Sequence, residues 1–245
     1  MDSGYYALST ALIARTQALD TIANNLANSS TTGFLAERNV FSSVLTASGN
    51  ASNSSLNLAI NNYGVLGETK LDTSQGALQK TGNDLDLALL GPGFFVVQTK
   101  NGPEYTRNGA FQVSSKGQLV TAAGDPVVGA KGAITMLPGP VSISADGTIS
   151  SNGAVTGKLQ LVEFPAGTAL KSAGGTYYTA PANSVVAAAD STVQQGALES
   201  SNVNPVSGMV ELISAQRSDE MMQRALSMFN SEIDKTATQD LPKIS

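Results

Sequence analysis

The distribution of glycine and proline divides this chain into three parts. The sequence holds 24 Gly and 9 Pro; none of them falls within 5–32 or 209–241, and all but two lie within 33–208. Because Gly and Pro interrupt helices and mark turns, both ends are free to form long helices, whereas the middle is rich in turns. The distribution predicts an α+β fold in which two terminal helices flank an inserted all-β domain.

Both ends carry apolar residues at alternating spacings of three and four, which is typical of a coiled-coil seam. Because one segment leads into the middle and the other leads out, we expect the two helices to pair as an antiparallel coiled coil. One pair cannot cover both seams and the alanine-rich flanks, so self-assembly is favoured over an intramolecular hairpin alone. The seam positions are Tyr5, Leu8, Leu12, Arg15, Leu19, Ile22 and Leu26 in the first segment, and Leu212, Ala215, Asp219, Met222, Leu226, Phe229 and Ile233 in the last.

Arg15 and Asp219 place one charge in each seam. A charge at such a position is costly unless it is paired or reaches water. In an antiparallel pair the two residues would lie about one helical turn apart. Two interpretations stay open: the residues form an ion pair, within one chain or between neighbours, or both face water and never meet.

Turn residues define the middle of the chain. We expect the first helix to stop in the turn-forming run 28–33, and the last to begin with Asn204 as N-cap and Pro205 as its first residue. Strands are expected at 84–87, 94–97 and 157–164, with Asn-Gly and Asp-Gly hairpin turns between strands. The expected domains are a first helix at 1–34, an irregular linker with short strands at 35–82, an outer β domain at 83–190, and a return segment with the last helix at 191–245.

The composition excludes several kinds of site. Without His or Cys the chain has neither a Ser-His-Asp triad nor a cysteine nucleophile, and a zinc site lacks its usual ligands. A net charge of −5, with basic residues scattered along the chain, argues against a nucleic-acid partner. No apolar run is long enough to span a membrane, and the start of the chain does not resemble a cleaved signal peptide.

Two short motifs contain residue types that can bind ions. Asp84 and Asp86 are expected on one strand face and could hold a cation, but the exposed side of an edge strand is favoured because no third ligand is evident. The run 91–93, Gly-Pro-Gly, is favoured as a tight turn because it lacks the Lys-Ser/Thr ending of a phosphate loop. We therefore predict no catalytic residue, no cofactor, no metal and no small-molecule substrate.

Three separated blocks of sequence resemble the bacterial flagellar axial proteins, the subunits of rod and hook. They are 19–28 with 31–34; 91–97 with 105–111 and 117–121; and 195–204 with 216–217. The motif residues are Asn24, Asn25, Asn28, Gly33 and Phe34 in the first block; Gly93, Phe94, Phe95, Tyr105, Thr106, Arg107, Gly109 and Phe111 in the second; and Ser201, Asn202, Val203, Gln216 and Arg217 in the third.

The resemblance implies a structural subunit of the flagellar basal-body rod, the drive shaft that carries torque from motor to hook. It implies helices in an inner tube, a β domain outside it, and partners that are copies of itself and other rod subunits. It also implies export through the flagellar type III apparatus into a rod that crosses the periplasm. The length favours a rod subunit over a hook subunit; the proximal rod is favoured and the distal rod is the alternative. A secreted β-domain enzyme and an adhesin are the competing classes of function.

Overall fold

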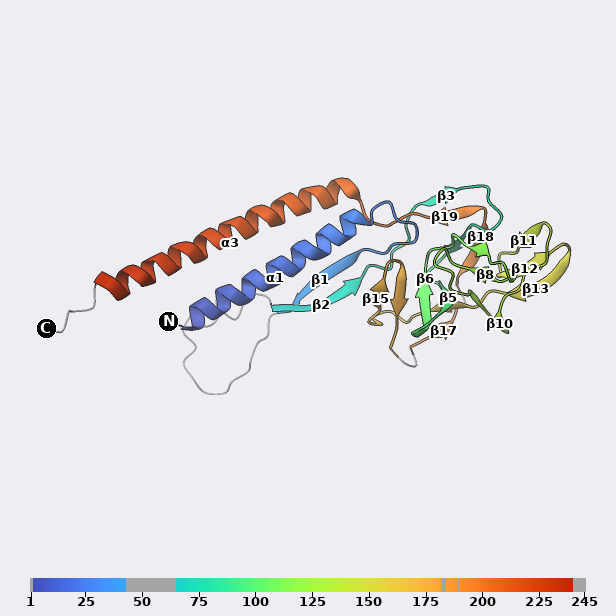
Figure 1. The fold of residues 1–245 in the computed structure, drawn as a ribbon, viewed down its shortest axis with the longest axis horizontal. Helices are drawn as coiled ribbons and strands as arrows, with labels where there is room; N and C mark the ends of the chain where they lie inside the picture. The colour runs from blue at the N-terminus through green and yellow to red at the C-terminus, as the bar shows by residue number, and fades with distance from the viewer. Residues whose placement is uncertain (1, 43–64, 182–183, 189, 240–245) are drawn as a thin grey trace. The chain divides into compact units, whose positions relative to one another are not determined.

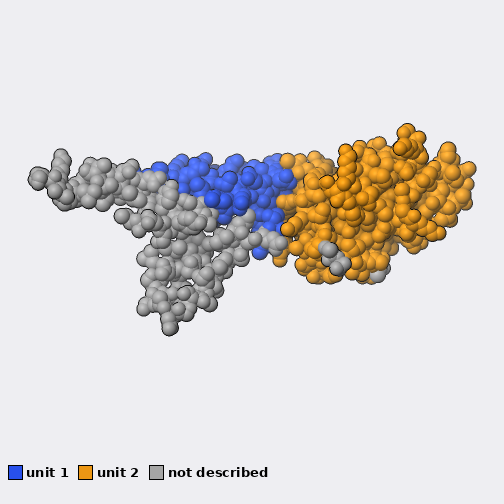
Figure 2. All heavy atoms as spheres, turned by 60° about the horizontal axis from the view of Figure 1, so that its bottom comes forward, with its two compact units in different colours: residues 1–26, 38–69, 205–245 blue, residues 27–37, 70–204 orange. Residues whose placement is uncertain are grey.

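The computed structural model describes residues 2–42, 65–181, 184–188 and 190–239 and divides the chain into two compact units (Figures 1 and 2). Part of the predicted linker, 43–64, lies outside the described residues. The predicted outer domain, 83–190, falls within unit 2, which also takes in sequence on both sides of it. Unit 1 comprises Met1–Leu26, Arg38–Thr69 and Pro205–Ser245; unit 2 comprises Ala27–Glu37 and Lys70–Asn204.

Unit 1 is built on the two helices that the sequence predicts. Helix α1 spans Asp2–Ala27 and α3 spans Pro205–Gln239; they run antiparallel, side by side (Figure 1). The end of α1 lies close to the start of α3, because a Cβ built on Gly208 would lie 3.7 Å from Leu26 Cδ1. The helices pair and the middle is β-rich, so the predicted α+β fold is confirmed.

A two-stranded sheet, β1 (Glu37–Ser42) with β2 (Val65–Leu71), accompanies α1. Asn39 Oδ1 accepts hydrogen bonds from Thr21 Oγ1 of α1 at 3.2 Å and from Thr69 Oγ1 of β2 at 3.3 Å. One amide therefore joins the helix to both strands.

The largest sheet of unit 2 has six strands in the order β15-β16-β6-β5-β14-β17, and every neighbouring pair is antiparallel. Strand β5 is buried on both faces because its side chains alternate between two apolar clusters: Phe95 and Val97 enter one, and Phe94 and Val96 enter the other. The strands are β5 (Phe94–Thr99), β6 (Gly102–Thr106), β14 (Leu161–Glu163), β15 (Lys171–Gly174), β16 (Tyr177–Thr179) and β17 (Val186–Ala187).

Smaller sheets complete unit 2. A three-stranded sheet consists of β11 (Val141–Ile143), β12 (Thr148–Ser151) and β13 (Ala154–Lys158). Four two-stranded sheets pair β3 (Leu78–Lys80) with β19 (Ala197–Glu199), β4 (Leu87–Leu90) with β18 (Thr192–Gln195), β7 (Gln112–Val113) with β8 (Leu119–Val120), and β9 (Val128–Gly129) with β10 (Gly132–Ala133).

Two expected strands differ from the structure. The residues before Leu87 form a turn and an isolated bridge, because Asp86 pairs with Ala110 alone and β4 begins only at Leu87. The expected strand 157–164 is two strands, since β13 pairs with β12 whereas β14 pairs with β5 in another sheet. Between them the buried Leu159 bridges to Gly129, and this change of partner ends one strand and starts the next.

One predicted Asn-Gly hairpin turn and the predicted tight turn are confirmed; the other Asn-Gly and Asp-Gly pairs are not type I′ turns, because Asn152 is the one described residue other than glycine with a positive φ. Asn152 and Gly153 join β12 to β13 with φ angles of 52° and 80°, as a type I′ turn requires. The Gly-Pro-Gly turn leads directly into β5, and Gly93 N donates to Ser191 Oγ at 2.7 Å.

Candidate functional site

The predicted seam positions of α3 lie on one side of that helix. Leu212, Ala215, Asp219, Met222 and Leu226 are half-buried, whereas the residues between them are exposed, apart from the half-buried Ser218. The predicted seam also includes Phe229 and Ile233 on α3 and Tyr5 and Leu8 on α1, whose side chains lie outside the described residues.

On α1 the covered surface is broader than the predicted seam. Leu12, Leu19, Ile22 and Leu26 are half-buried, but the most buried described side chain is Ala14, at 5% exposure. Ala14 falls outside the expected spacing. The breadth follows from two neighbours, because α3 covers one side of α1 and the β1–β2 sheet bonds to another through Thr21.

Arg15 and Asp219 do not pair within the chain. Among the ion pairs of the described residues none joins them, and Arg15 is exposed. Asp219 Oδ2 instead accepts a hydrogen bond from Gln223 Nε2 at 2.8 Å, while its Oδ1 is buried without a partner among the described residues. The intramolecular form of the pairing hypothesis is therefore wrong, because the long Arg15 side chain reaches water; pairing between neighbours stays a prediction.

A second apolar surface lies on the opposite side of α3. At about 100° per residue the six exposed apolar residues fall on the face turned away from the seam positions. We call this surface the outward face. It consists of Val206, Met209, Val210, Ile213, Met221 and Met228, which are 52–71% exposed. Arg217, Glu220 and Arg224 lie on the same side between its two apolar ends, with Arg224 Nη2 3.8 Å from Glu220 Oε2.

Within unit 2, motif residues from separate blocks converge on one buried ion pair. Arg107 is fully buried, and its Nη1 donates to Oε2 and Oε1 of Glu199 at 3.2 and 3.4 Å. Its guanidinium carbon lies 4.8 Å from the centre of the Phe94 ring, a cation–π contact. Glu199 Oε1 also accepts from Gly76 N at 2.9 Å, and the backbone carbonyl of Glu199 accepts from Gly33 N at 2.8 Å.

Asn202 ties together the chain segments beside this pair. Its Oδ1 accepts from Ala36 N at 2.7 Å, and its Nδ2 donates to the carbonyl oxygens of Asp72 and Ser74 at 2.8 and 3.0 Å. Next to it, Tyr178 Oη accepts from Leu35 N at 2.8 Å. Burial raises the pKa of Tyr178 to about 12. All three chain segments of unit 2 that continue into unit 1 are thereby bound to one another inside unit 2.

The remaining motif residues occupy other places in the fold. Phe95 and Phe111 stack edge to face in the larger apolar cluster, and burial raises the pKa of Tyr105 in the smaller one. A Cβ on Gly109 would overlap the carbonyl of Leu87, so this position requires glycine. The last turn of α1 contains Asn24 and Asn25, Asn28 directly follows that helix, and Val203 precedes α3. The buried motif residues include Thr106 and Ser201, whereas Gln216 and Arg217 are exposed on α3.

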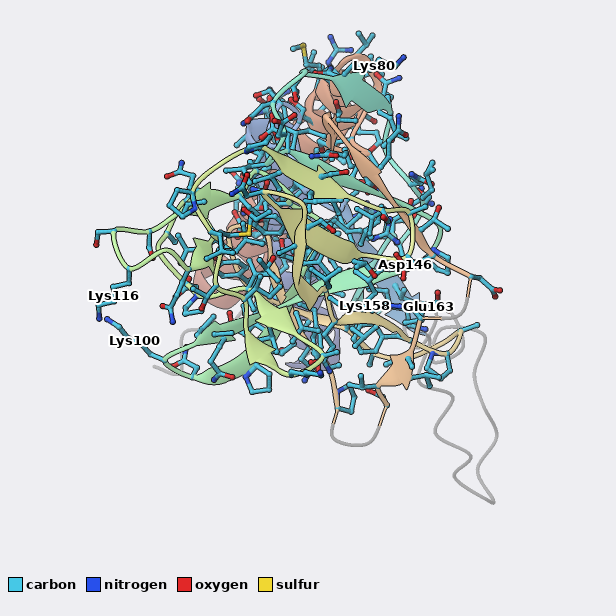
Figure 3. All side chains as sticks on the ribbon, turned by 90° about the vertical axis from the view of Figure 1, so that its right-hand side faces the viewer. Lys80, Lys100, Lys116, Asp146, Lys158 and Glu163 are labelled. Atoms are coloured by element: carbon cyan, nitrogen blue, oxygen red, sulfur yellow. The ribbon has the colours of Figure 1, made fainter. Side chains whose placement is uncertain are left out.

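The charged and concave surfaces of unit 2 offer little for chemistry. Figure 3 shows Asp146 beside Lys158, whose Nζ lies 3.0 Å from Asp146 Oδ2. A hydrogen bond from the Thr148 hydroxyl is the main cause that lowers the pKa of Asp146 to about 2, and a hydrogen bond from Lys158 is the second cause.

The predicted pairing of Asp84 and Asp86 on one strand face is wrong. Asp86 accepts a hydrogen bond from Asn83 Nδ2 at 3.0 Å, and Asp84 lies in the turn before β4. No group of three or more potential metal ligands occurs among the described residues, and none of the described helices is long and apolar enough to cross a membrane.

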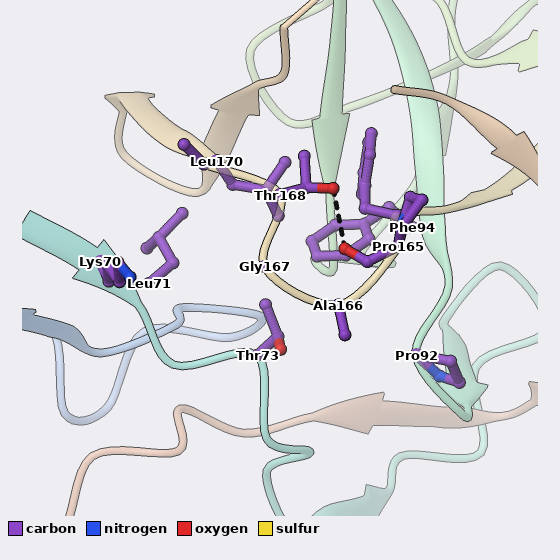
Figure 4. Close-up of a pocket in the computed structure, with 12 residues that line it drawn as sticks. Lys70, Leu71, Thr73, Pro92, Phe94, Pro165, Ala166, Gly167, Thr168 and Leu170 are labelled. Carbon is purple, nitrogen blue, oxygen red and sulfur yellow. Dashed lines mark hydrogen bonds between the residues drawn. The ribbon is translucent and has the colours of Figure 1, made fainter. Parts of the chain in front are cut away.

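A pocket of about 220 Å³ opens beside the smaller apolar cluster (Figure 4). Phe94, Phe164, Leu71 and Leu170 form its apolar lining, and the 165–169 loop closes one side, where Thr168 Oγ1 donates to the Pro165 carbonyl at 2.7 Å. Lys70 is the sole titratable side chain among the residues that line it. The pocket therefore lacks a pair of groups for proton transfer.

Sequence reasoning missed Glu199 and Tyr178 as partners of the motif residues. Glu199 falls inside the third motif block, and this position was the usable signal for it, since the residues around Arg107 are mostly polar and do not mark it as buried. No such signal marked Tyr178, because its bond to Leu35 joins positions 143 residues apart.

Three family models match the chain in sequence order. The models described as flagella basal body rod protein, flagellar hook protein FlgE/F/G D1 domain, and flagellar basal body rod FlgEFG protein C-terminal match residues 6–34, 88–157 and 194–239. The flagellar basal-body rod protein FlgF of Caulobacter vibrioides is 34% identical over 250 residues, covering 100% of both chains. The chain belongs to the flagellar basal-body rod FlgE/F/G family.

Within this family the chain is FlgF-like. FlgF of Salmonella typhimurium is 37% identical over 90% of this chain and 92% of the relative. The rod protein FlgG of Buchnera aphidicola subsp. Schizaphis graminum is 34% identical over 96% of each chain and is a weaker match. Membership makes this chain a structural subunit of the flagellar basal-body rod and not an enzyme.

Proposed function

We propose that the chain assembles helically with copies of itself and with other flagellar rod subunits, and that the outward face of α3 is buried in that assembly. The supporting observation is the geometry of α3, which is covered by α1 on one side and exposes apolar side chains on the other. An exposed apolar surface of this kind marks a protein–protein interface in a stable assembly. Arg217, Glu220 and Arg224 would set the register, because charges within an apolar interface oppose shifted contacts.

The proximal part of the rod is the proposed location, with the distal rod as the alternative. Relatives named FlgF are 34–37% identical to this chain, and those named FlgG are 32–34% identical. The assembled subunit would carry torque across the periplasm as part of the drive shaft. It would reach that site through the flagellar type III export apparatus.

Substitution on the outward face tests the proposed assembly. Ile213→Asp would bury an unpaired charge, which costs several kcal/mol, so we expect no incorporation into basal bodies and no swimming. Ala225→Asp is the matched control, because Ala225 is exposed on the flank of α3 and the new residue is the same. Swimming and incorporation are measured in a strain that lacks the subunit. Full incorporation of the Ile213→Asp chain would overturn the proposed interface.

Complementation separates the two rod locations. The chain is expressed in one strain that lacks its FlgF relative and in another that lacks FlgG. Rescue of swimming in the first strain alone is expected for a proximal-rod subunit. Rescue of the second strain alone would favour the distal rod.

A further inference from the structure

The described methionines divide sharply between the two units. Met136 lies in the apolar core of unit 2 at 6% exposure, whereas Met209, Met221, Met222 and Met228 all belong to α3. Three of these four lie on the outward face with 52–65% exposure, and Met222 is half-buried on the side toward α1. Half of the apolar side chains of the outward face are therefore thioethers open to solvent in the free subunit.

Thioethers react with peroxides in a way that leucine and valine do not. The sulfur attacks one peroxide oxygen, the O–O bond breaks, and a sulfoxide and one molecule of water (or alcohol) result. The product is a polar, chiral group in place of a flexible apolar one. Burying its oxygen without a hydrogen-bond donor opposes the contact that the unmodified side chain favours.

We propose that Met209, Met221 and Met228 form a peroxide-sensitive modification site that governs entry of the subunit into the rod. Oxidation of the free subunit blocks incorporation, and incorporation in turn shields the three sulfur atoms from peroxide. Methionine sulfoxide reductases reverse the block, because they return the sulfoxide to the thioether. This inference rests on the proposed burial of the outward face.

Peroxide footprinting tests the shielding. The free full-length chain and isolated basal bodies are treated with hydrogen peroxide, and sulfoxide at each methionine is measured by peptide mass spectrometry. We expect Met209, Met221 and Met228 to oxidise at least about tenfold more slowly in basal bodies, in line with their loss of access. Met136 is the internal control and should resist oxidation in both samples. Equal rates at the three positions would overturn the proposed interface and this inference with it.

Paired variants test separately whether a polar group at the three methionine positions prevents incorporation into the rod. A triple variant with Met209→Gln, Met221→Gln and Met228→Gln places polar side chains of similar length at the three positions. The matched triple Met→Leu variant keeps them apolar but removes the sulfur. We expect the Leu chain to restore swimming in a strain that lacks the subunit, and the Gln chain to fail although unit 2 remains folded. Shielding in the footprint together with full rescue by the Gln chain would overturn this inference and leave the assembly interface standing.

Discussion

At the scale of single residues, the stability of unit 2 depends on how buried polar groups find partners. Arg107 and Glu199 are 0% and 1% exposed, so each has lost its hydration and relies on the other. The Phe94 ring and the Gly76 amide supply further favourable contacts. Nε and Nη2 of Arg107 have no hydrogen-bond partner among the described residues, so the cost of burying this side chain is only partly offset. The ion pair therefore contributes more to the specificity of the fold, which must bring Arg107 and Glu199 together, than to its stability.

Removing one member of this pair should destabilise unit 2 strongly. Arg107→Met leaves the Glu199 carboxylate buried without its cation, and breaking such a pair costs about 3–5 kcal/mol. The double variant with Glu199→Gln should recover much of that loss. Unfolding of the full chain in urea is the measurement. Lys158→Met is the control, since it breaks the exposed pair with Asp146 and should leave the midpoint unchanged; an equal shift in both single variants would contradict this account.

Tyr178 should make stability fall in strongly alkaline solution. Its pKa is about 12 in the folded chain and near 10 when unfolded, so above pH 10 the unfolded chain loses this proton first. The stabilising contribution is complete below pH 10 and is lost as the pH rises through 12. Tyr178→Phe should flatten that part of the stability–pH curve, measured by urea unfolding from pH 9 to 11.5. An unchanged slope in the variant would assign the alkaline loss to other groups.

At the scale of elements, the turn after α1 shows how a helix end is fixed by its neighbours. Helix α1 ends at Ala27, and Gly33 adopts a φ of 69°, a conformation that favours glycine. A Cβ at Gly33 would also overlap the backbone of Asn108, so the turn packs directly against the segment that follows β6. Two motif blocks far apart in sequence therefore meet without an intervening side chain.

Comparing two glycines should separate backbone strain from this close contact. Gly33 and Gly82 have similar φ angles, 69° and 73°, but a Cβ at Gly82 would meet nothing within 4 Å. Gly82→Ala should cost about 1–2 kcal/mol from the left-handed conformation alone. Gly33→Ala should cost roughly 2 kcal/mol more from the overlap with Asn108. The free energy of unfolding of each variant is the measurement, and equal losses would show that the turn moves aside freely.

At the scale of the whole molecule, the two units differ in what stabilises them. The described part of unit 2 has two apolar clusters and a buried ion pair, whereas the 35-residue helix α3 of unit 1 is covered on one side and exposes apolar side chains on the other. Isolated helices with an uncovered apolar face are marginal in water. The outward face of α3 therefore lacks a covering partner among the described residues, and in the proposed assembly a neighbouring subunit would supply it.

Limited proteolysis of the purified chain should reveal this difference. We expect a protease of broad specificity to cut first within 1–32 and 205–245 and to leave a resistant fragment that contains 83–190. Mass spectrometry of the early fragments identifies the cuts. In isolated basal bodies the same helices should resist cleavage, because the proposed assembly would cover them with neighbouring subunits. Early cleavage inside 83–190 would contradict this division of stability.

The sequence by itself determined the helices and their pairing, because the positions of Gly and Pro and the spacing of apolar residues are local properties of the chain. It also determined the Asn152–Gly153 hairpin, whose turn residues specify their own backbone angles. Only the tertiary structure decided that Arg107 meets Glu199, 92 residues away, and that 157–164 is shared between two sheets. It also decided that Ala14 is the most buried described residue of α1 and that Arg15 reaches water. The physical reason is that local patterns fix which surface of an element is apolar, whereas the partner that covers it depends on segments brought together by the whole fold.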